Sequence, residues 1–185
     1  MQENQRTRIT KIMLKDSLIS LLHKENIHKL TVTKICEDAQ INRTTFYKYY
    51  GSQYDLLEEI ERDALNQIRS YVEVEVDGED SGNIHQLTKT FSFFSDNIEL
   101  FKLLLSNNVN PDFPEKLVLS LQNIPRLTSR QVPEKYGNDE FDYIFEFMIN
   151  GGFSFIKRWI NKENRESPEE IAVLLDSLII KLLNP

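Results

Sequence analysis

Two helix-capping residues stand close together near the start of the chain, and they restrict its fold more than any other feature. Thr31 and Asn42 each precede a short segment that mixes apolar and polar residues. Threonine and asparagine side chains accept hydrogen bonds from the free amides of a helix's first turn. The sequence therefore predicts two short helices, over residues 32–39 and 43–49, joined by a turn at residues 40–42.

Apolar residues recur at helical spacing along most of the chain, which contains only 6 glycines and 6 prolines. This pattern favours long helices over turns. The further predicted helices cover residues 8–24, 53–76, 84–96, 98–108, 139–163 and 168–183, with one more between Pro114 and Pro125. We expect an all-α chain of about nine helices. Its organisation would be an N-terminal module (1–52), a connecting helix (53–76) and a C-terminal helical domain (77–185) that starts with a loop at 77–83.

Capping signals mark the start of two of the longer helices. Ser52 followed by Asp55, and Ser167 followed by Glu170, are typical of a capping box, in which each side chain accepts a backbone amide near the other residue. Gly51 precedes the first box, where a left-handed backbone conformation would cost glycine nothing. Both helix starts are therefore expected at these residues.

Charge and composition limit the class of protein. Residues 1–55 carry nine Lys/Arg and six Asp/Glu (9 − 6 = +3), whereas residues 56–185 carry 13 and 23 (13 − 23 = −10). This asymmetry suggests a basic module joined to an acidic one. One cysteine excludes an internal disulfide and a cysteine-rich metal site. The chain shows no signal-peptide-like start and no apolar run of roughly 18 residues, so we expect a cytoplasmic protein that does not enter a membrane.

No catalytic constellation is visible in the sequence. It contains no His/Asp/Glu cluster with metal-ligand spacing, no nucleophile motif and no glycine-rich loop that could hold phosphate. We therefore expect no enzyme activity, no metal and no cofactor.

A longer helix followed by two short helices and a tight turn is the plan of a helix-turn-helix module. The second short helix of such a module enters the major groove, where its N-terminal residues reach base edges. Arg43, Thr44 and Thr45 would then read bases, while Phe46 would turn inward. Aromatic packing between helices is the alternative explanation of the "TFYKYY" run.

The residues around this helix can contact phosphates. Tyrosine hydroxyls donate hydrogen bonds to phosphate oxygens, and a lysine adds charge. The predicted DNA-contacting residues are Thr31, Thr33, Asn42, Arg43, Thr44, Thr45, Tyr47, Lys48, Tyr49 and Gln53. The expected partner is double-stranded DNA.

The segment "LTVTKICEDAQINRTTFYKYYGSQYDLL" resembles the TetR family of bacterial transcriptional regulators. The resemblance rests on Thr31–Val32, Ile35, Ile41–Asn42, "TFYKYY" and Leu56–Leu57. Farther along, "FFSDNIELFKLLL" and "INGGFSFIKRWI" are similar to a subgroup that includes regulators linked to dihydroxyacetone kinase. The resemblance implies an N-terminal DNA-binding domain and a C-terminal domain for dimerisation and effector binding.

Three residues depart from the family pattern. Gln40 stands in the turn, where glycine is common and where another residue can be strained. Cys36 replaces a frequent alanine and is interpreted as a small buried apolar residue. Gln53 replaces a lysine at the start of the connecting helix. Because glutamine releases no counterion, we expect somewhat weaker and less salt-dependent DNA binding than in a typical member.

The last two predicted helices are apolar on most sides, which indicates burial in a core or at a subunit interface. The resemblance implies that they form a four-helix interface with a second copy of the chain. Two glycines near the middle of the penultimate helix would allow close helix approach. The residues assigned to this interface are Gly151, Gly152, Phe155, Trp159, Leu174, Leu175, Leu178 and Leu182. A core formed only within one chain is the alternative.

The family resemblance also implies an effector pocket among the middle helices. Its candidate lining is Phe91, Phe94, Phe101, Leu104, Phe113, Phe145 and Met148, although an aromatic stripe at this spacing also fits a plain core. The favoured function is a ligand-responsive repressor that binds a near-palindromic operator as a homodimer. The alternatives are a TetR-like activator that uses a partner protein, an all-helical protein-interaction module, and a helical enzyme with its site among residues 90–160.

Overall fold

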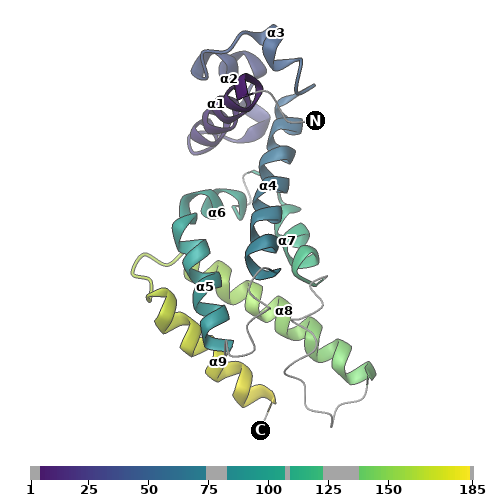
Figure 1. Cartoon of the computed structure of the whole chain (residues 1–185), viewed down its shortest axis with the longest axis vertical. Helices are drawn as coiled ribbons and strands as arrows, with labels where there is room; N and C mark the ends of the chain where they lie inside the picture. Colours follow the sequence, from purple (N-terminus) through teal and green to yellow (C-terminus); the bar gives the residue numbers. More distant parts are fainter. Residues whose placement is uncertain (1–4, 74–82, 107–108, 123–137, 184–185) are drawn as a thin grey trace. The chain divides into compact units, whose positions relative to one another are not determined.

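The computed structural model describes residues 5–73, 83–106, 109–122 and 138–183, and all regular structure in these ranges is helical (Figure 1). Nine α-helices and one short 3₁₀ helix follow one another in this described part, which confirms the predicted all-α class. They are α1 (Gln5–Leu22), η1 (Ile27–Lys29), α2 (Val32–Asp38), α3 (Arg43–Phe46), α4 (Gln53–Glu73), α5 (Asn83–Asp96), α6 (Ile98–Leu104), α7 (Phe113–Gln122), α8 (Asn138–Ile160) and α9 (Pro168–Leu183).

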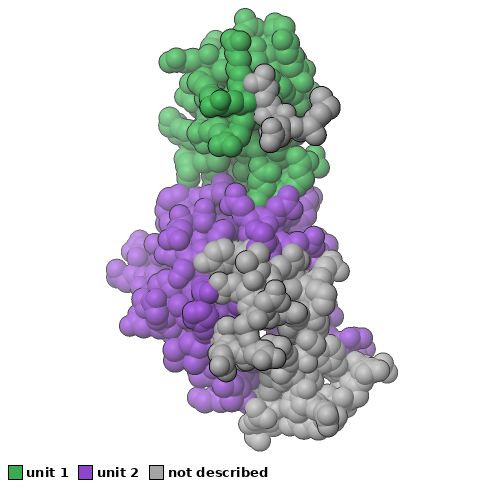
Figure 2. Space-filling model, in the orientation of Figure 1, with its two compact units in different colours: residues 1–64, 103–111 green, residues 65–102, 112–185 purple. Residues whose placement is uncertain are grey.

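The chain forms two compact units, shown in different colours in Figure 2. Unit 1 consists of residues 1–64 and 103–111, and unit 2 of residues 65–102 and 112–185. Helix α4 begins in unit 1 and ends in unit 2. Most of the predicted loop at residues 77–83, and the end of the predicted helix at residue 76, lie outside the described residues.

The core of unit 1 is built by α1, α2, α3 and the first half of α4. Its fully buried side chains are Leu14, Leu18, Ile27, Leu30, Ile35, Phe46 and Leu56, each exposed by 1% or less. Cys36 is also buried, and burial raises the pKa of its thiol, partly against the effect of nearby Arg43. The segment between α1 and α2 thus contributes Ile27 and Leu30 to the core.

Ion pairs join α1 to α4 within unit 1. Lys15 Nζ lies 2.7 Å from Glu59 Oε1 and 2.5 Å from Asp63 Oδ2, and Lys11 Nζ lies 3.4 Å from Glu59 Oε2. Burial alone would raise the pKa of Glu59, but the hydrogen bond from Lys15, the charges of Lys15 and Lys11 and a hydrogen bond from Tyr50 together hold that pKa below its ordinary value. The two helices are therefore held together by charge as well as by apolar packing.

A segment from later in the chain completes unit 1. Asn110 Nδ2 donates a hydrogen bond of 2.7 Å to Oε1 of Glu61, whose side chain is only 2% exposed. A buried carboxylate needs such donors because its desolvation is costly. Residues 103–111 thus belong with the first half of α4, although about forty residues separate them in sequence.

The core of unit 2 is aromatic, and α5 lies along α9 (Figure 1). The ring centroids of Phe94 and Phe101 are 4.8 Å apart at 72°, and those of Phe91 and Trp159 are 5.1 Å apart at 77°. These edge-to-face arrangements are the ones that aromatic quadrupoles favour. Trp159 Nε1 also donates to the Glu166 carbonyl oxygen at 3.0 Å, so the indole is fully satisfied inside the unit.

Several predicted helix boundaries need correction. Helix α3 ends at Phe46 instead of residue 49, because residues 47–49 form a tighter turn with Lys48 N–H donating to Thr45 O and Tyr49 N–H to Phe46 O. Helix α6 ends at Leu104 rather than residue 108.

Both predicted capping boxes are confirmed. Asp55 N–H donates to Ser52 Oγ at 3.3 Å, and Glu170 N–H donates to Ser167 Oγ at 3.2 Å. The explanation given for Gly51 is wrong, because its φ is not positive. A Cβ at Gly51 would instead lie 2.9 Å from Asp55 Oδ2, which accepts the Gly51 N–H at 2.8 Å. Glycine at this position therefore leaves room for the carboxylate that accepts its N–H, and a larger residue would displace that carboxylate.

Candidate nucleic-acid interface

The turn before α3 is set by backbone hydrogen bonds and one unusual residue. Ile41 N–H donates to Cys36 O at 2.9 Å, and Asn42 Oδ1 accepts the Thr44 N–H at 2.8 Å. Gln40 has a φ of 55°, the left-handed conformation in which a residue with a Cβ is strained. The sequence had indicated this strain, and the capping role of Asn42 is confirmed.

Phe46 fixes α3 to the rest of unit 1. Its side chain has no exposed surface, and its ring centroid lies 5.6 Å from those of both Tyr47 and Tyr50. Tyr50 is itself only 4% exposed. Because one side of this short helix is anchored, the residues on its other side keep a defined orientation.

The first turn of α3 presents polar side chains to solvent. Arg43 and Thr44 are exposed and Thr45 is half-buried. The Arg43 guanidinium carbon lies 6.0 Å from the centroid of the Tyr47 ring, a cation–π contact that holds the side chain next to the ring. Arginine can pair bidentately with guanine, and threonine can contact base edges or a thymine methyl group.

The tyrosines of this region differ in exposure. Tyr47 is 51% exposed and Lys48 is also exposed, so both are available to phosphates. Tyr49 is half-buried, and its hydroxyl lies 3.4 Å from Thr7 Oγ1. Tyr50 is part of the core. The dense aromatic run therefore supplies both an inner anchor and an outer polar face.

The remaining predicted contact residues lie at the starts of α2 and α4. Thr31 is exposed and its Oγ1 accepts the Lys34 N–H at 3.3 Å, while Thr33 and Gln53 are half-buried. Between these helix starts, His28 Nδ1 lies 3.0 Å from the Tyr54 hydroxyl. The sequence interpretation missed this pair, although Tyr54 directly follows Gln53. It links the 3₁₀ turn that precedes α2 to the first turn of α4.

Five of the seven residues assigned to an effector pocket are buried. Phe91, Phe94, Phe101, Leu104 and Phe113 are each exposed by 1% or less, and Phe145 and Met148 are half-buried. Leu104 belongs to unit 1, whereas the other six belong to unit 2. Phe91, Phe94, Phe101 and Phe113 thus form closely packed core in this structure.

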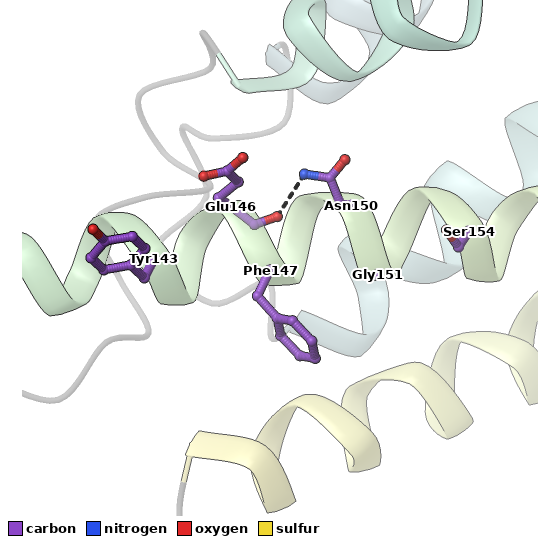
Figure 3. Close-up of a pocket in the computed structure, with 6 residues that line it drawn as sticks. All are labelled: Tyr143, Glu146, Phe147, Asn150, Gly151 and Ser154. Atoms are coloured by element: carbon purple, nitrogen blue, oxygen red, sulfur yellow. Dashed lines mark hydrogen bonds between the residues drawn. The ribbon is translucent and has the colours of Figure 1, made fainter.

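An open groove instead runs along α8 (Figure 3). It has a volume of about 430 Å³ and is lined by Tyr143, Glu146, Phe147, Asn150, Gly151 and Ser154. Tyr143 is 76% exposed and Phe147 is 65% exposed, and a Cβ added at Gly151 would meet nothing within 4 Å. We call this surface the α8 face. Among the residues that the structure describes, no other part of the chain therefore packs closely against Gly151.

The residues assigned to a dimer interface fall into two groups. Gly151, Leu174 and Leu178 are exposed, and Gly152, Phe155 and Leu175 are half-buried. Trp159 was assigned wrongly, because it is 3% exposed and lies in the core of its own chain. The side chain of Leu182 is outside the part described.

Two observations limit other kinds of site. In the described part of the chain, no group of three or more His, Cys, Asp or Glu side chains could hold a metal ion. None of the described helices is long and apolar enough to cross a membrane.

Comparison with known protein families gives two matches. The family described as "Bacterial regulatory proteins, tetR family" matches residues 16–60, which include α2 and α3. The family described as "Transcriptional regulator C-terminal region", a TetR C-terminal family, matches residues 83–181 and thus more than half of the chain. No curated protein matches the chain.

Several solved structures share the fold. A TetR transcriptional regulator from Streptococcus agalactiae 2603V is 22% identical with a TM-score of 0.72, covering 95% of this chain and 96% of its own. The fatty acid degradation regulator FadR from Bacillus halodurans is 12% identical with a TM-score of 0.70, covering 100% and 99%.

The dihydroxyacetone kinase operon activator DhaS is 16% identical with a TM-score of 0.66, covering 94% of this chain and 96% of its own. At these identities the structures show a shared fold only, so the narrower subgroup resemblance stays a prediction. The two family matches, by contrast, cover the module with the exposed first turn of α3 and most of the C-terminal helices. The chain belongs to the TetR family of bacterial transcriptional regulators, and it is a DNA-binding regulator rather than an enzyme.

Proposed function

We propose that the chain represses transcription by binding a near-palindromic operator as a homodimer. One observation carries the operator-reading part of this proposal: Arg43 and Thr44 are exposed on the first turn of a helix that the fully buried Phe46 anchors. A helix so held can place its N-terminal side chains in the major groove. Arg43 would read a guanine, while Tyr47 and Lys48 would contact phosphates.

The first experiment selects bound duplexes from a random pool and then measures affinity for the selected site by fluorescence anisotropy at two salt concentrations. The expected result is a specific site whose affinity falls as salt rises, because phosphate contacts release counterions. Arg43→Ala should relax the sequence preference at one base pair per half-site. The discrimination against the wrong base at that position should fall by about 1–3 kcal/mol.

A matched cation elsewhere provides the control. Lys102 pairs with Glu99 at 3.0 Å on α6, so Lys102→Ala removes a positive charge far from α3 in the sequence. It should leave both affinity and sequence choice unchanged. Selection of no sequence from the pool would overturn the proposal, and equal effects of the two substitutions would exclude base reading by Arg43.

The homodimer is supported by the α8 face and by exposed leucines on α9. Phe147 and Tyr143 protrude from α8, and Leu174 and Leu178 are 45% and 40% exposed on α9. Apolar side chains this exposed mark an interaction surface. Phe147 also lies one helical turn before Gly151, where the surface is open. In a two-fold interface each Phe147 would therefore fit over the partner's Gly151.

Sedimentation velocity tests this dimer. Phe147→Glu should convert the dimer to a monomer and lower operator affinity, because two half-sites would no longer be bound together. Leu119→Glu is the control, since Leu119 is a 50% exposed leucine on α7. A dimer that survives Phe147→Glu would exclude this face as the interface.

Response to a small molecule would require the aromatic core of unit 2 to open. Phe91, Phe94 and Phe101 leave no exposed surface for a ligand in this state. A ligand could then act only by binding an opened state more tightly than the packed one. Such a ligand should lower operator affinity, and the measurement is an anisotropy titration of the protein–DNA complex. A ligand that binds unit 2 and leaves operator affinity unchanged would contradict this part of the proposal.

A further inference from the structure

Helix α1 carries apolar side chains on two faces. Its inner face supplies Leu14 and Leu18 to the core, while Ile9, Ile12 and Met13 are 51%, 45% and 39% exposed on the outside. Three neighbouring exposed apolar side chains on one helix are stronger evidence of a contact surface than a single exposed apolar side chain. We call these three residues the α1 stripe.

A groove continues from the end of this stripe. It has a volume of about 380 Å³ and is lined by Met13, Asp16, Ser17, Ser20, Asp38, Ala39 and Gln40, all within unit 1. We call it the α1 groove. Ser17 and Ala39 are small and buried, whereas Met13 and Gln40 are exposed. An apolar helix lying on the stripe could therefore insert a side chain between α1 and the turn that precedes α3.

The strained residue of the turn lines this groove. Gln40 has a φ of 55°, and a left-handed conformation costs an L-residue on the order of 1–2 kcal/mol, which glycine would avoid. Strained backbone of this kind clusters at functional sites. The side chain of Gln40 is exposed and lines the α1 groove, so it is available to a docked partner.

The groove is acidic. Asp16 and Asp38 are exposed, and neither has an ion-pair partner among the residues that the structure describes. Elsewhere in unit 1, Glu25, Glu59 and Asp63 are paired with lysines. Two unneutralised carboxylates repel DNA phosphates and attract cations. The chemistry of the groove thus suits a basic protein segment and not DNA.

We propose that the α1 stripe and the α1 groove dock a helix of a second protein that is bound to the same DNA, with apolar residues facing the stripe and a lysine or arginine between Asp16 and Asp38. This docking rests on the proposed operator binding, because the shared DNA brings the two proteins together at high effective concentration. The contact joins two proteins on DNA and uses none of the residues that line the α8 face.

Photo-crosslinking tests the proposal with bacterial RNA polymerase holoenzyme as the probe, since this enzyme shares promoter DNA with any transcriptional regulator. A benzoylphenylalanine is introduced at position 13, and the protein is bound to a selected operator placed beside a promoter. Crosslinked peptides are identified by mass spectrometry. The expected product joins position 13 to a basic helical segment of the polymerase.

Substitutions in the groove establish the chemistry. Asp16→Asn with Asp38→Asn should lower the crosslink yield about fivefold, the effect of losing two partly exposed charge contacts. Gln40→Gly should also lower it while preserving the turn. Glu58→Gln is the matched control, because Glu58 is an exposed carboxylate on α4 in the same unit, and it should leave the yield unchanged.

Three results would overturn the inference: no crosslink to the polymerase on occupied DNA, a crosslink to another copy of this chain, or a yield that Asp16→Asn with Asp38→Asn does not change. A gel shift run in parallel reports operator occupancy. If the wild-type protein gives no gel shift, the proposed operator binding itself has failed. A gel shift without a crosslink would instead overturn only the docking inference.

Discussion

At the scale of single residues, the aromatic run of residues 46–50 contains both buried residues that anchor α3 and exposed residues that can contact DNA. Phe46 and Tyr50 are buried, Tyr47 is half exposed, and Tyr49 is half-buried beside Thr7. Each side chain therefore has a different expected effect on DNA binding, although the sequence shows them as near neighbours. Substitutions that remove only a hydroxyl distinguish them without disturbing the packing.

Tyr47→Phe should weaken operator binding by about 0.5–1.5 kcal/mol, equally for all DNA sequences, because it removes one hydrogen bond to a phosphate. Tyr49→Phe should have a smaller effect, since that hydroxyl lies 3.4 Å from Thr7 Oγ1 within the protein. Anisotropy titrations on the selected site and on one mismatched site measure both. A larger loss for Tyr49→Phe, or a loss confined to one sequence, would contradict these roles.

Gln40 gives a prediction about stability. Gln40→Gly should be more stable than Gln40→Ala by about 1 kcal/mol, because alanine keeps the strain of the left-handed backbone and glycine does not. Both variants lose the long glutamine side chain, so the difference between them reports the effect of the backbone conformation. Urea unfolding of the two proteins provides the measurement. Equal midpoints would show that the turn relaxes when its side chain is shortened.

The sequence could predict residue roles that depend on local chemistry. Thr31, Asn42 and Ser52 were recognisable as caps because a cap and its amide lie within three residues of each other. The role of Gly51 was not recognisable in this way. It depends on where the Asp55 carboxylate folds back, and this position is decided only when α4 has formed.

At the scale of elements, the contact of α1 with α4 depends on pH. The folded pKa of Glu59 is lowered from an ordinary value of 4.5, so its stabilisation is present above pH 4.5 and is lost as pH falls through the folded pKa. Burial alone would lower the pKa of Lys15, but Asp63 and Glu59 raise it above 10.5. The Lys15 contribution is therefore present below pH 10.5 and is lost as pH rises through the folded value.

Glu59→Gln should lower the free energy of unfolding at neutral pH by about 1 kcal/mol, because it leaves two lysines without their shared partner. The difference from wild type should shrink as pH falls below 4.5, where Glu59 itself becomes protonated. Urea unfolding at neutral and acidic pH measures it. Glu58→Gln is the control, and a difference that grows at low pH would contradict the assignment.

The existence and order of the helices could be predicted because helical periodicity and caps are local signals. The end of α3 could not, since residues 47–49 tighten into a turn while Phe46 and Tyr50 both remain in the core. The association of Asn110 with Glu61 was equally invisible, because no local pattern joins residues so far apart in sequence.

At the scale of the whole molecule, the open α8 face links stability to association. If two chains pair through Phe147 and Gly151, the thermal midpoint should rise with protein concentration, because a dimer that forms only from folded chains stabilises them by mass action. Differential scanning fluorimetry over a hundredfold range of concentration measures this. In Phe147→Glu the midpoint should be lower and independent of concentration, and a midpoint that never depends on concentration would exclude an obligate dimer.

The sequence indicated that α8 and α9 are too apolar for ordinary surface helices, but it could not show which side of each helix is buried and which is exposed. Periodicity shows that apolar residues surround α8, yet only packing decides that Trp159 turns toward Phe91 while Tyr143 and Phe147 remain exposed. The aromatic residues assigned to a pocket show the same limit. Spacing cannot distinguish the lining of a cavity from a closely packed core.

The hydrogen bond between Asn110 and Glu61 has a consequence for protein engineering. A DNA-binding module that is cut from this chain within or after α4 would leave residues 103–111 behind. The graft would then carry a carboxylate that is 2% exposed in its native setting and has lost its 2.7 Å donor. Chimeras of this chain should therefore be assembled from two separate pieces of sequence, residues 1–64 and 103–111, so that Asn110 stays with Glu61.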